Sequence, residues 1–246
     1  MFTQLAHAIE EGDKQKCEDI WRRILPSLRD EYSLADPVFL RLYDFVEDIV
    51  FKSLDALKER GFREKLLELA PLLSALDRAA DVIGELSRIF LKEGLDNKLK
   101  YYAACVLYAI DVEGQFVQAC RVLYLLYKSS TGEVISLSEI ENLSLRKIRE
   151  ELKTLTHGES EILFLGWEDN HLRNAIFHMR IKYDNSSTEM SFEDYDMSKG
   201  NVSYDEKLTY SEFSRLTHLI NGVSFVFLFI MMILSARDMA FANELP

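Results

Sequence analysis

The feature that most constrains the fold is the segment of residues 98–128, which is apolar on nearly every side of a helix. Its two halves read YYAACVLYAI and FVQACRVLYLLY, and Gly114 lies between them. A helix without a polar face has to be buried, so other helices must surround this segment. Gly114 leaves open whether the segment forms one helix or two. In either case the sequence predicts a helical bundle with this segment at its centre.

Capping residues indicate where the other helices begin and end. Asp36 and Pro37 are typical of an N-cap and a first helical residue, and they open a helix that we expect to stop at Gly61. A second periodic stretch covers residues 63–93. Further breaks and caps are expected at Pro71, Gly94, Asp96, Asn97, Thr131 and Gly132.

The second half of the chain combines helices with short strands. Ser138 and Glu141 match a capping box, which predicts a helix to about residue 155, and residues 159–179 are expected to form the next helix. Three segments then alternate polar with aromatic or β-branched residues, as short strands do: residues 179–184, 189–194 and 201–207.

A final helix is predicted from the capping box of Thr209 and Glu212 to about residue 240, and it contains the apolar segment 223–234. This segment has twelve residues, whereas a helix needs roughly 20 apolar residues to cross a bilayer. We therefore expect a buried core or dimer-interface helix here; the alternative is a membrane-associated helix.

The chain has an odd number of widely spaced cysteines, Cys17, Cys105 and Cys120, which indicate neither a disulfide framework nor a zinc site. Each lies in an apolar, helical context and is expected to be a buried free thiol. The first residues lack the basic and then apolar order of a signal peptide. These features fit a cytoplasmic protein.

Composition favours a mainly helical fold. The 246 residues include only 10 Gly and 4 Pro, fewer than the turns of an all-β protein would need. We expect an all-α protein, a helical bundle with a small β-hairpin insertion after the helix of residues 159–179. Residues 1–94 are expected to form an N-terminal helical region without a chemical motif, and residues 95–246 a C-terminal helical-bundle domain.

The formal net charge of −12 excludes a generally nucleic-acid-binding surface, because non-specific phosphate binding needs a basic one. An RNA-directed function would need a local basic site within an acidic protein. Residues 184–206 hold seven acidic residues and one lysine, which fits either a solvated hairpin or a surface for a basic partner. The sequence lacks the GxxxxGK[ST], GxGxxG, GxSxG and HExxH motifs, so the enzyme classes that use them are not indicated.

One stretch, HLRNAIFHMR at residues 171–180, gathers side chains that suit chemistry on a phosphate. On a helix, one stripe carries the polar residues His171, Asn174 and His178. A second stripe is apolar and should dock on the bundle: Leu172, Ala175, Ile176 and Met179. The flank between them holds Arg173, Phe177 and Arg180.

These residue types suit phosphodiester cleavage. Histidine can take or give a proton near neutral pH, and arginine binds phosphate oxygens and stays charged. RNA carries its own nucleophile, the 2′-hydroxyl, so no metal or cofactor is required. Arg173 and His178 lie about 140° apart around a helix, so they converge only if the arginine folds over or if the helix ends near His178. Asn174, one turn before His178, can orient its imidazole or hold a phosphate oxygen.

Arg173 and Asn174, followed by three residues and His178, resemble the R-x(4–6)-H motif of the HEPN superfamily, which often places a polar residue after the arginine. The succession of a helix, a short β-hairpin and a long apolar helix is also similar, over residues 95–246. The resemblance implies a bundle of four to five helices, a metal-independent endoribonuclease and a homodimer that joins two motifs in one cleft. It also implies a toxin–antitoxin or phage-defence setting. Members paired with a nucleotidyltransferase antitoxin often carry R-x4-H-x-Y, and Arg180 at the tyrosine position argues against that partnership.

We therefore predict metal-independent RNA cleavage with Arg173, Asn174 and His178 as catalytic residues, and with His171 and Arg180 binding the substrate. The expected partners are RNA, a second copy of the chain, and an antitoxin or regulatory protein; no cofactor, metal or membrane is expected. The alternative is a non-catalytic helical module that binds a protein or nucleotide ligand.

Overall fold

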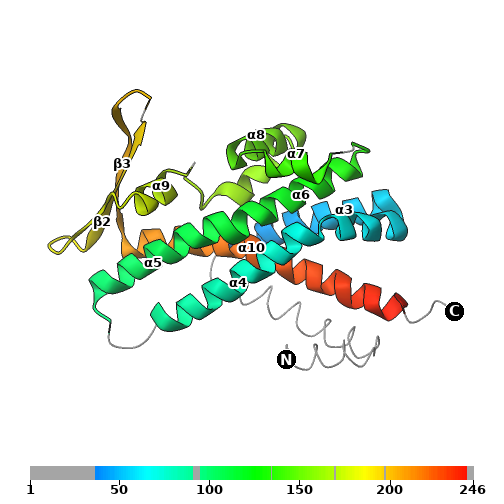
Figure 1. The fold of residues 1–246 in the computed structure, drawn as a ribbon, viewed down its shortest axis with the longest axis horizontal. Helices are drawn as coiled ribbons and strands as arrows, with labels where there is room; N and C mark the ends of the chain where they lie inside the picture. The colour runs from blue at the N-terminus through cyan, green and yellow to red at the C-terminus, as the bar shows by residue number, and fades with distance from the viewer. Residues whose placement is uncertain (1–36, 91–94, 134, 169, 197, 243–246) are drawn as a thin grey trace.

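The computed structural model describes residues 37–90, 95–133, 135–168, 170–196 and 198–242 (Figure 1). Its helices are, in chain order, α3 (Pro37–Glu68), α4 (Ala70–Phe90), α5 (Asn97–Asp111), η1 (Val112–Phe116), α6 (Val117–Ser130), α7 (Leu137–Glu141), α8 (Leu145–Leu155), η2 (Glu159–Phe164), α9 (His171–Phe177) and α10 (Tyr210–Ala242). The strands are β1 (Ile181–Asp184), β2 (Glu189–Asp196) and β3 (Asn201–Thr209). A mainly helical protein with a small antiparallel sheet is thus confirmed.

The elements α5, η1 and α6 form one continuous helical rod through the middle of the molecule (Figure 1). Asp96 caps α5 as expected, because its Oδ1 accepts a hydrogen bond from the Leu99 N–H at 2.8 Å. Gly114 does not separate two helices, since it lies in η1, a π-helical turn. Thr131 and Gly132 end the rod as predicted. Helices α3, α4 and α10 pack against it and supply the burial that its apolar sequence requires.

Gly114 is needed where α4 crosses the π turn. A Cβ at this position would lie 2.8 Å from the Cβ of Ala79 in α4, a distance that packed carbon atoms do not reach. The absent side chain therefore lets α4 approach the rod closely. π turns occur often at functional sites. This one also carries Glu113, which contacts Arg173 of α9.

The predicted end of α3 at Gly61 is wrong. The helical geometry breaks at Lys58 instead (φ 57°, ψ 169°), three residues before Gly61, and helical turns then run through Gly61 to Glu68. A glycine inside a helix costs only about 1 kcal/mol, so these turns tolerate Gly61. The predicted break near Pro71 is confirmed, because α3 ends before it and Pro71 sits in the first turn of α4.

The first helix after the rod begins two residues earlier than predicted. Its capping box joins Ser136 to Glu139, and the helix that it opens, α7, is only five residues long. A separate helix, α8, begins after the N-cap Ser144. The expectation of one helix from the cap at Ser138 to residue 155 is therefore wrong, because Ser136 and Ser144 each cap a helix of their own.

Residues 159–179 do not form one helix. The 3₁₀-helix η2 ends at Phe164, and α9 starts only at His171 after Asn170 in a left-handed conformation (φ 70°). Gly166 explains the interruption: a Cβ there would lie 2.6 Å from the Leu216 carbonyl oxygen of α10. The hydroxyl of Tyr108 also donates a hydrogen bond to the Gly166 carbonyl at 3.0 Å. These contacts fix the loop to α5 and α10 and so place the start of α9.

The predicted strands form a three-stranded antiparallel sheet in the order β1-β2-β3, one strand more than a simple hairpin. Its inner face packs on the helices through Met190 and Phe192, which are fully buried. The Phe192 ring stacks on Phe213 of α10 with centroids 5.4 Å apart. The capping box of Thr209 and Glu212 then turns the chain directly from β3 into α10, as predicted.

The described first part of the apolar segment 223–234 is buried in the core, as Val223 and Phe227 show. The side chains of Phe225 and of residues 228–242 lie outside the described part. No helix of the described chain is both long enough and apolar enough to cross a membrane. Cys105 and Cys120 are buried free thiols, and burial raises the pKa of both, whereas Cys17 lies outside the described residues.

Helices α3 and α4 belong to the region assigned to residues 1–94, and they share one hydrophobic core with α5, α6 and α10. Residues 1–36 and 91–94 of that region lie outside the described residues. The division of the chain into an N-terminal region of residues 1–94 and a domain of residues 95–246 stays a prediction.

Two glycine substitutions test the packing of α4 on the rod. We expect Gly114→Ala to lower the free energy of unfolding by about 1–3 kcal/mol, because its Cβ collides with that of Ala79. Gly84→Ala, in α4 with no atom within 4 Å of the added Cβ, should instead raise it by about 0.5–1 kcal/mol. Urea unfolding measures both. Adding Ala79→Gly to Gly114→Ala should recover part of the loss, and a strictly additive double variant would contradict the proposed collision.

Candidate functional site

Helix α9 is short and is anchored by three side chains. Leu172, Ala175 and Ile176 are buried, and the helix packs against β2 and α5 (Figure 1). This part of the predicted apolar stripe is confirmed. Met179 does not belong to the stripe, because the helix ends at Phe177 and the Met179 backbone turns left-handed (φ 54°). Its side chain is 82% exposed.

The first turn of α9 faces a buried carboxylate on β2. Asp194 is 6% exposed, and its Oδ2 accepts a hydrogen bond from Asn174 Nδ2 at 3.1 Å. The same oxygen lies 3.0 Å from Nδ1 of His171, while Oδ1 accepts the backbone N–H of Tyr195 at 2.9 Å. Asp194 therefore joins two of the predicted site residues to the sheet.

The surroundings of Asp194 determine which nitrogen of His171 faces its carboxylate as a donor. Burial acts to raise the pKa of Asp194, but the hydrogen bonds from His171, Asn174 and the Tyr195 amide outweigh it and hold this pKa below its ordinary value. An ionised carboxylate only accepts hydrogen bonds, so Nδ1 of His171 carries the proton. In the neutral imidazole, Nε2 is then the nitrogen that can accept one.

The orientation of the His171 ring is fixed by a second contact from the sheet. The ring stacks on Tyr204 of β3, with centroids 5.0 Å apart and an interplanar angle of 8°. Tyr204 pairs directly with Asp194 across β2 and β3. Two neighbouring positions of the sheet thus hold one imidazole, by a hydrogen bond and by a stacked ring.

Arg173 turns away from this cluster towards the rod. Its Nε lies 2.8 Å from Oε1 of Glu113 in η1, as an ion pair without the alignment of a hydrogen bond. Both side chains are partly exposed, and a pair of this kind contributes roughly 0–1 kcal/mol. The guanidinium is therefore held by a weak contact that a phosphate could replace.

His178 and Arg180 lie beyond the last residue of α9. The imidazole of His178 is exposed and has no hydrogen-bond partner among the described residues. The guanidinium of Arg180 stacks on the Tyr195 ring, 4.5 Å from its centroid. Phe177, next to His178, is 51% exposed.

The structure brings together His171 and Asn174 but does not join Arg173 to His178. The helix ends near His178, as the convergence of these two residues would need, yet Arg173 points to Glu113 and no described contact links the pair. His171 and His178 are seven residues apart, which is roughly 10 Å along a helix axis. The two imidazoles of one chain therefore do not meet at a single phosphate.

Asp194 and Glu113 belong to the site but were not found from the sequence. Residues 184–206 were expected to be solvated or to face a basic partner, whereas Asp194 is buried. The period-two pattern of β2 contained the signal, because Met190, Phe192 and Asp194 occupy the same face of the strand. An acidic residue at a core position needs a buried partner. Glu113 had no comparable signal, since its contact depends on the π turn.

The described residues contain no group of three or more His, Cys, Asp or Glu side chains arranged to hold a metal ion. Comparison of the chain with protein-family models, with curated proteins and with solved structures found no match.

Asp194→Asn tests the anchoring role of the buried carboxylate. We expect a loss of about 1–3 kcal/mol in the free energy of unfolding at pH 7, because a hydrogen-bonded charge is removed from a buried position. The folded pKa of Asp194 is depressed, so this stabilisation is present above the unfolded pKa of about 3.9 and is lost as the pH falls through the folded value. The difference between wild type and variant should therefore shrink below about pH 4.

Asp205→Asn provides the matched control, because Asp205 is an exposed carboxylate on β3. We expect it to change the free energy of unfolding by less than about 0.5 kcal/mol. Equal losses in the two variants at pH 7 would show that Asp194 has no special role.

Proposed function

We propose that this protein is a metal-independent endoribonuclease that cleaves RNA through attack of the substrate's own 2′-hydroxyl, in a toxin–antitoxin or phage-defence setting. The observation that carries the proposal is the arrangement on α9. An anchored helix presents His171, held by a buried carboxylate, together with Asn174 and Arg173. The resemblance of Arg173, Asn174 and His178 to the R-x(4–6)-H motif supports the same chemistry.

The proposed reaction needs a base, an acid and a positive charge. The base removes the proton of the 2′-hydroxyl, and the oxygen attacks phosphorus while the bond to the 5′-oxygen breaks. The acid returns a proton to that leaving oxygen, which gives a 2′,3′-cyclic phosphate and a 5′-hydroxyl. His178 serves as general acid or base, Arg173 stabilises the phosphorane and Asn174 orients the site. His171 and Arg180 contact the substrate.

The Asp194 contact supports a larger role for His171 than substrate binding. With Nδ1 donating to the carboxylate, Nε2 is free to accept the 2′-hydroxyl proton. The carboxylate also stabilises the imidazolium that forms. We therefore propose His171 as the base and His178 as the acid.

This division of roles requires a dimer. One helix separates the two histidines by roughly 10 Å, too far for both to act on one phosphate. Two α9 helices that face each other across a twofold axis would place His171 of one chain opposite His178 of the partner. Each cleft would then hold one complete pair.

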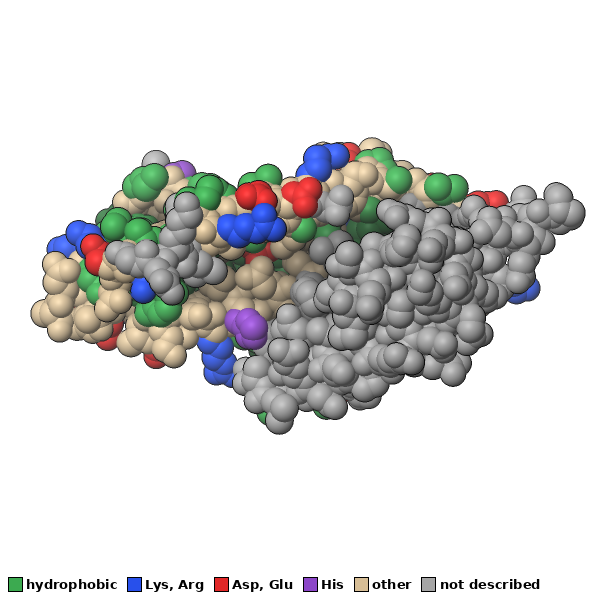
Figure 2. All heavy atoms as spheres, turned by 90° about the horizontal axis from the view of Figure 1, so that it is seen from below, with side chains coloured by type: hydrophobic (Ala, Val, Ile, Leu, Met, Phe, Trp, Pro, Cys, Tyr) green, Lys and Arg blue, Asp and Glu red, His purple; other side chains and the backbone are tan. Residues whose placement is uncertain are grey.

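The acidic character of the protein limits how RNA can bind. On the described part of the face in Figure 2, Lys and Arg side chains form small separate groups, with Asp and Glu beside several of them. Binding would therefore depend on local contacts such as Arg173 and Arg180. When a phosphate replaces Glu113 at Arg173, only a weak ion pair is lost.

The second candidate function is a non-catalytic module that binds a protein, such as an antitoxin or regulatory protein. The observation that favours it is the exposure of Phe177 and Met179 on either side of an unpartnered His178. Exposed large apolar side chains of this kind are typical of protein interfaces. This candidate predicts binding without cleavage.

Substitutions in α9 test the enzyme proposal. We expect Arg173→Ala, His171→Ala and His178→Ala each to lower single-turnover cleavage of RNA by about 10²–10⁴-fold, because a proton-transfer group or the phosphorane-stabilising charge is lost. Asn174→Ala should have a smaller effect. The control His157→Ala removes an exposed histidine outside α9 and should keep full activity. Cleavage should persist in EDTA, and fragments should end in 2′,3′-cyclic phosphates.

Circular dichroism should show an unchanged helical signal in the His178 variant, because its side chain is exposed. Metal-dependent cleavage, 5′-phosphate ends or full activity of the His178 variant would contradict the mechanism. An RNA that is bound but never cut would favour the binding module.

Light scattering tests the dimer. We expect twice the monomer mass at micromolar concentration, and we expect Phe177→Glu to shift the protein towards the monomer, because its exposed ring lies next to His178. The control Tyr210→Glu changes an equally large exposed residue at the far end of the sheet and should remain dimeric. A monomeric wild type would rule out the shared cleft.

A further inference from the structure

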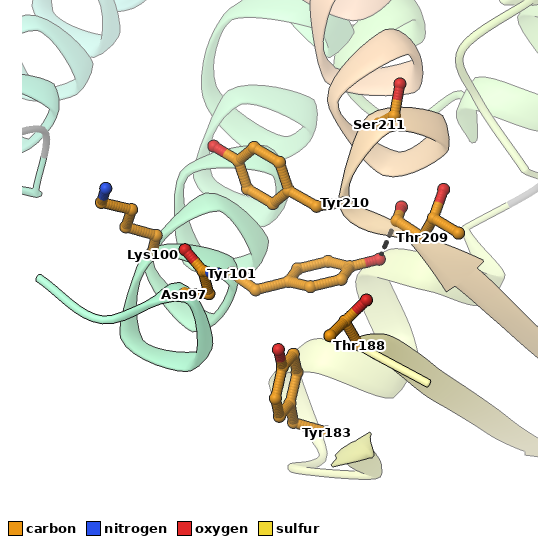
Figure 3. Close-up of a pocket in the computed structure, with 8 residues that line it drawn as sticks. All are labelled: Asn97, Lys100, Tyr101, Tyr183, Thr188, Thr209, Tyr210 and Ser211. Carbon is orange, nitrogen blue, oxygen red and sulfur yellow. Dashed lines mark hydrogen bonds between the residues drawn. The ribbon is translucent and has the colours of Figure 1, made fainter. Parts of the chain in front are cut away.

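A pocket of about 400 Å³ opens where α5 and α10 begin, beside the sheet (Figure 3). It is lined by Asn97, Lys100, Tyr101, Tyr183, Thr188, Thr209, Tyr210 and Ser211. Its volume lies within the range of roughly 300–1,000 Å³ that is usual for small-molecule sites. Tyr183 of the lining pairs with Met190 of β2, which is four residues from Asp194. The pocket therefore lies roughly 13 Å along the strand from the contact of Asp194 with His171 and Asn174.

Aromatic rings form the rigid part of the pocket. Figure 3 shows the Tyr101 ring between those of Tyr183 and Tyr210. Tyr101 meets each of them edge-on, with centroid distances of 6.3 Å and 5.4 Å. Its hydroxyl is fixed by hydrogen bonds to the carbonyl oxygens of Leu208 and Thr209, at 2.7 Å and 3.0 Å. Such preorganised rings favour a flat ligand that stacks or packs edge-to-face.

Several polar side chains of the lining make no hydrogen bond or ion pair within the described part of the chain. The side chains of Asn97, Lys100 and Ser211 have no hydrogen-bond or ion-pair partner among the described residues. The hydroxyls of Tyr183 and Tyr210 likewise have none there. By contrast, the Tyr101 hydroxyl and the Thr209 side chain are both hydrogen-bonded. The free groups therefore surround the rings, with Asn97 and Lys100 on one side and Ser211 on the other (Figure 3).

The charge of the lining comes from Lys100. Four carboxylates are adjacent to lining residues in sequence. Asp96 and Glu212 are occupied by helix capping, because Asp96 accepts from the Leu99 N–H and Glu212 accepts from the Thr209 N–H and hydroxyl. Asp184 accepts from the N–H and hydroxyl of Ser186, and Glu189 alternates with Met190 on β2 and so belongs to the face of the sheet opposite Tyr183. An ammonium without a partner beside an aromatic wall is suited to a ligand that carries negative charge.

We propose that this pocket binds a small aromatic anion, a flat ring that carries one carboxylate or phosphate group. The ring packs against Tyr183 and Tyr210, which the buried ring of Tyr101 supports, and the anionic group binds the ammonium of Lys100. Asn97, on the same side of the rings as Lys100, donates a further hydrogen bond to its oxygens (Figure 3). The proposal does not depend on RNA cleavage, because none of these residues lies on α9.

NMR titration of the full chain tests the proposal with four probes. We expect 4-hydroxybenzoate or phenyl phosphate to bind saturably and to shift the Tyr101 and Tyr183 resonances, and the tighter of the two identifies the anionic group. Benzyl alcohol, which has the ring without the charge, should bind at least tenfold more weakly. Inorganic phosphate, which has the charge without a ring, should not compete.

Two variants locate the contacts. Lys100→Gln should weaken binding of the preferred probe about tenfold, since a charge-assisted contact is lost, and Tyr210→Ser should weaken it several-fold. The control Lys98→Gln makes the same change of charge on the same helix outside the lining and should leave affinity unchanged. The proposal is overturned by an absence of saturable binding, by equal affinity for benzyl alcohol, or by equal effects of the two lysine variants.

Discussion

The burial of a helix that has no polar face is the constraint on which the rest of the structure depends. The rod of α5, η1 and α6 is apolar around most of its surface, so α3, α4 and α10 must cover it. Close coverage by α4 is accommodated by Gly114, and the same π turn presents Glu113 to α9. At the other end of α5, Tyr101 packs on Phe213 and supports the sheet from which Asp194 reaches His171. The packing of the core thus positions both acidic partners of α9, Glu113 on the rod and Asp194 on the sheet.

The sequence predicted those elements whose signals are local. The cap at Asp96, the end of the rod at Gly132, the break near Pro71 and the turn from β3 into α10 each depend on residues within one or two turns of the boundary. The wrong predictions concern places where contacts between residues distant in the sequence determine whether a segment is helical. Residues 159–179 are divided because Gly166 meets the α10 backbone. Gly61 is a separate case, since helical turns tolerate its low propensity.

The candidate site was predicted only in part for the same reason. Helical periodicity placed Leu172, Ala175 and Ile176 in the core and left His171, Arg173 and Asn174 accessible. It could not find their partners, because Asp194 follows α9 by about twenty residues and Glu113 precedes it by about sixty. These acidic partners give the imidazole a defined tautomer and the guanidinium a weak ion pair. In the function that we propose, the imidazole is thereby prepared for proton transfer, and the charge of Arg173 is partly neutralised by Glu113 until a phosphate binds.

The proposal that α9 acts on RNA is tested most directly by titrating the protein with a 2′-O-methyl oligoribonucleotide, which lacks the nucleophile and can bind without being cut. Histidine side-chain NMR signals report the contact. We expect the imidazole resonances of His171 and His178 to shift saturably, while that of His157, outside α9, stays in place. Shifts confined to residues outside α9, or no shift at oligonucleotide concentrations that saturate binding, would contradict the assignment of α9 as the active site.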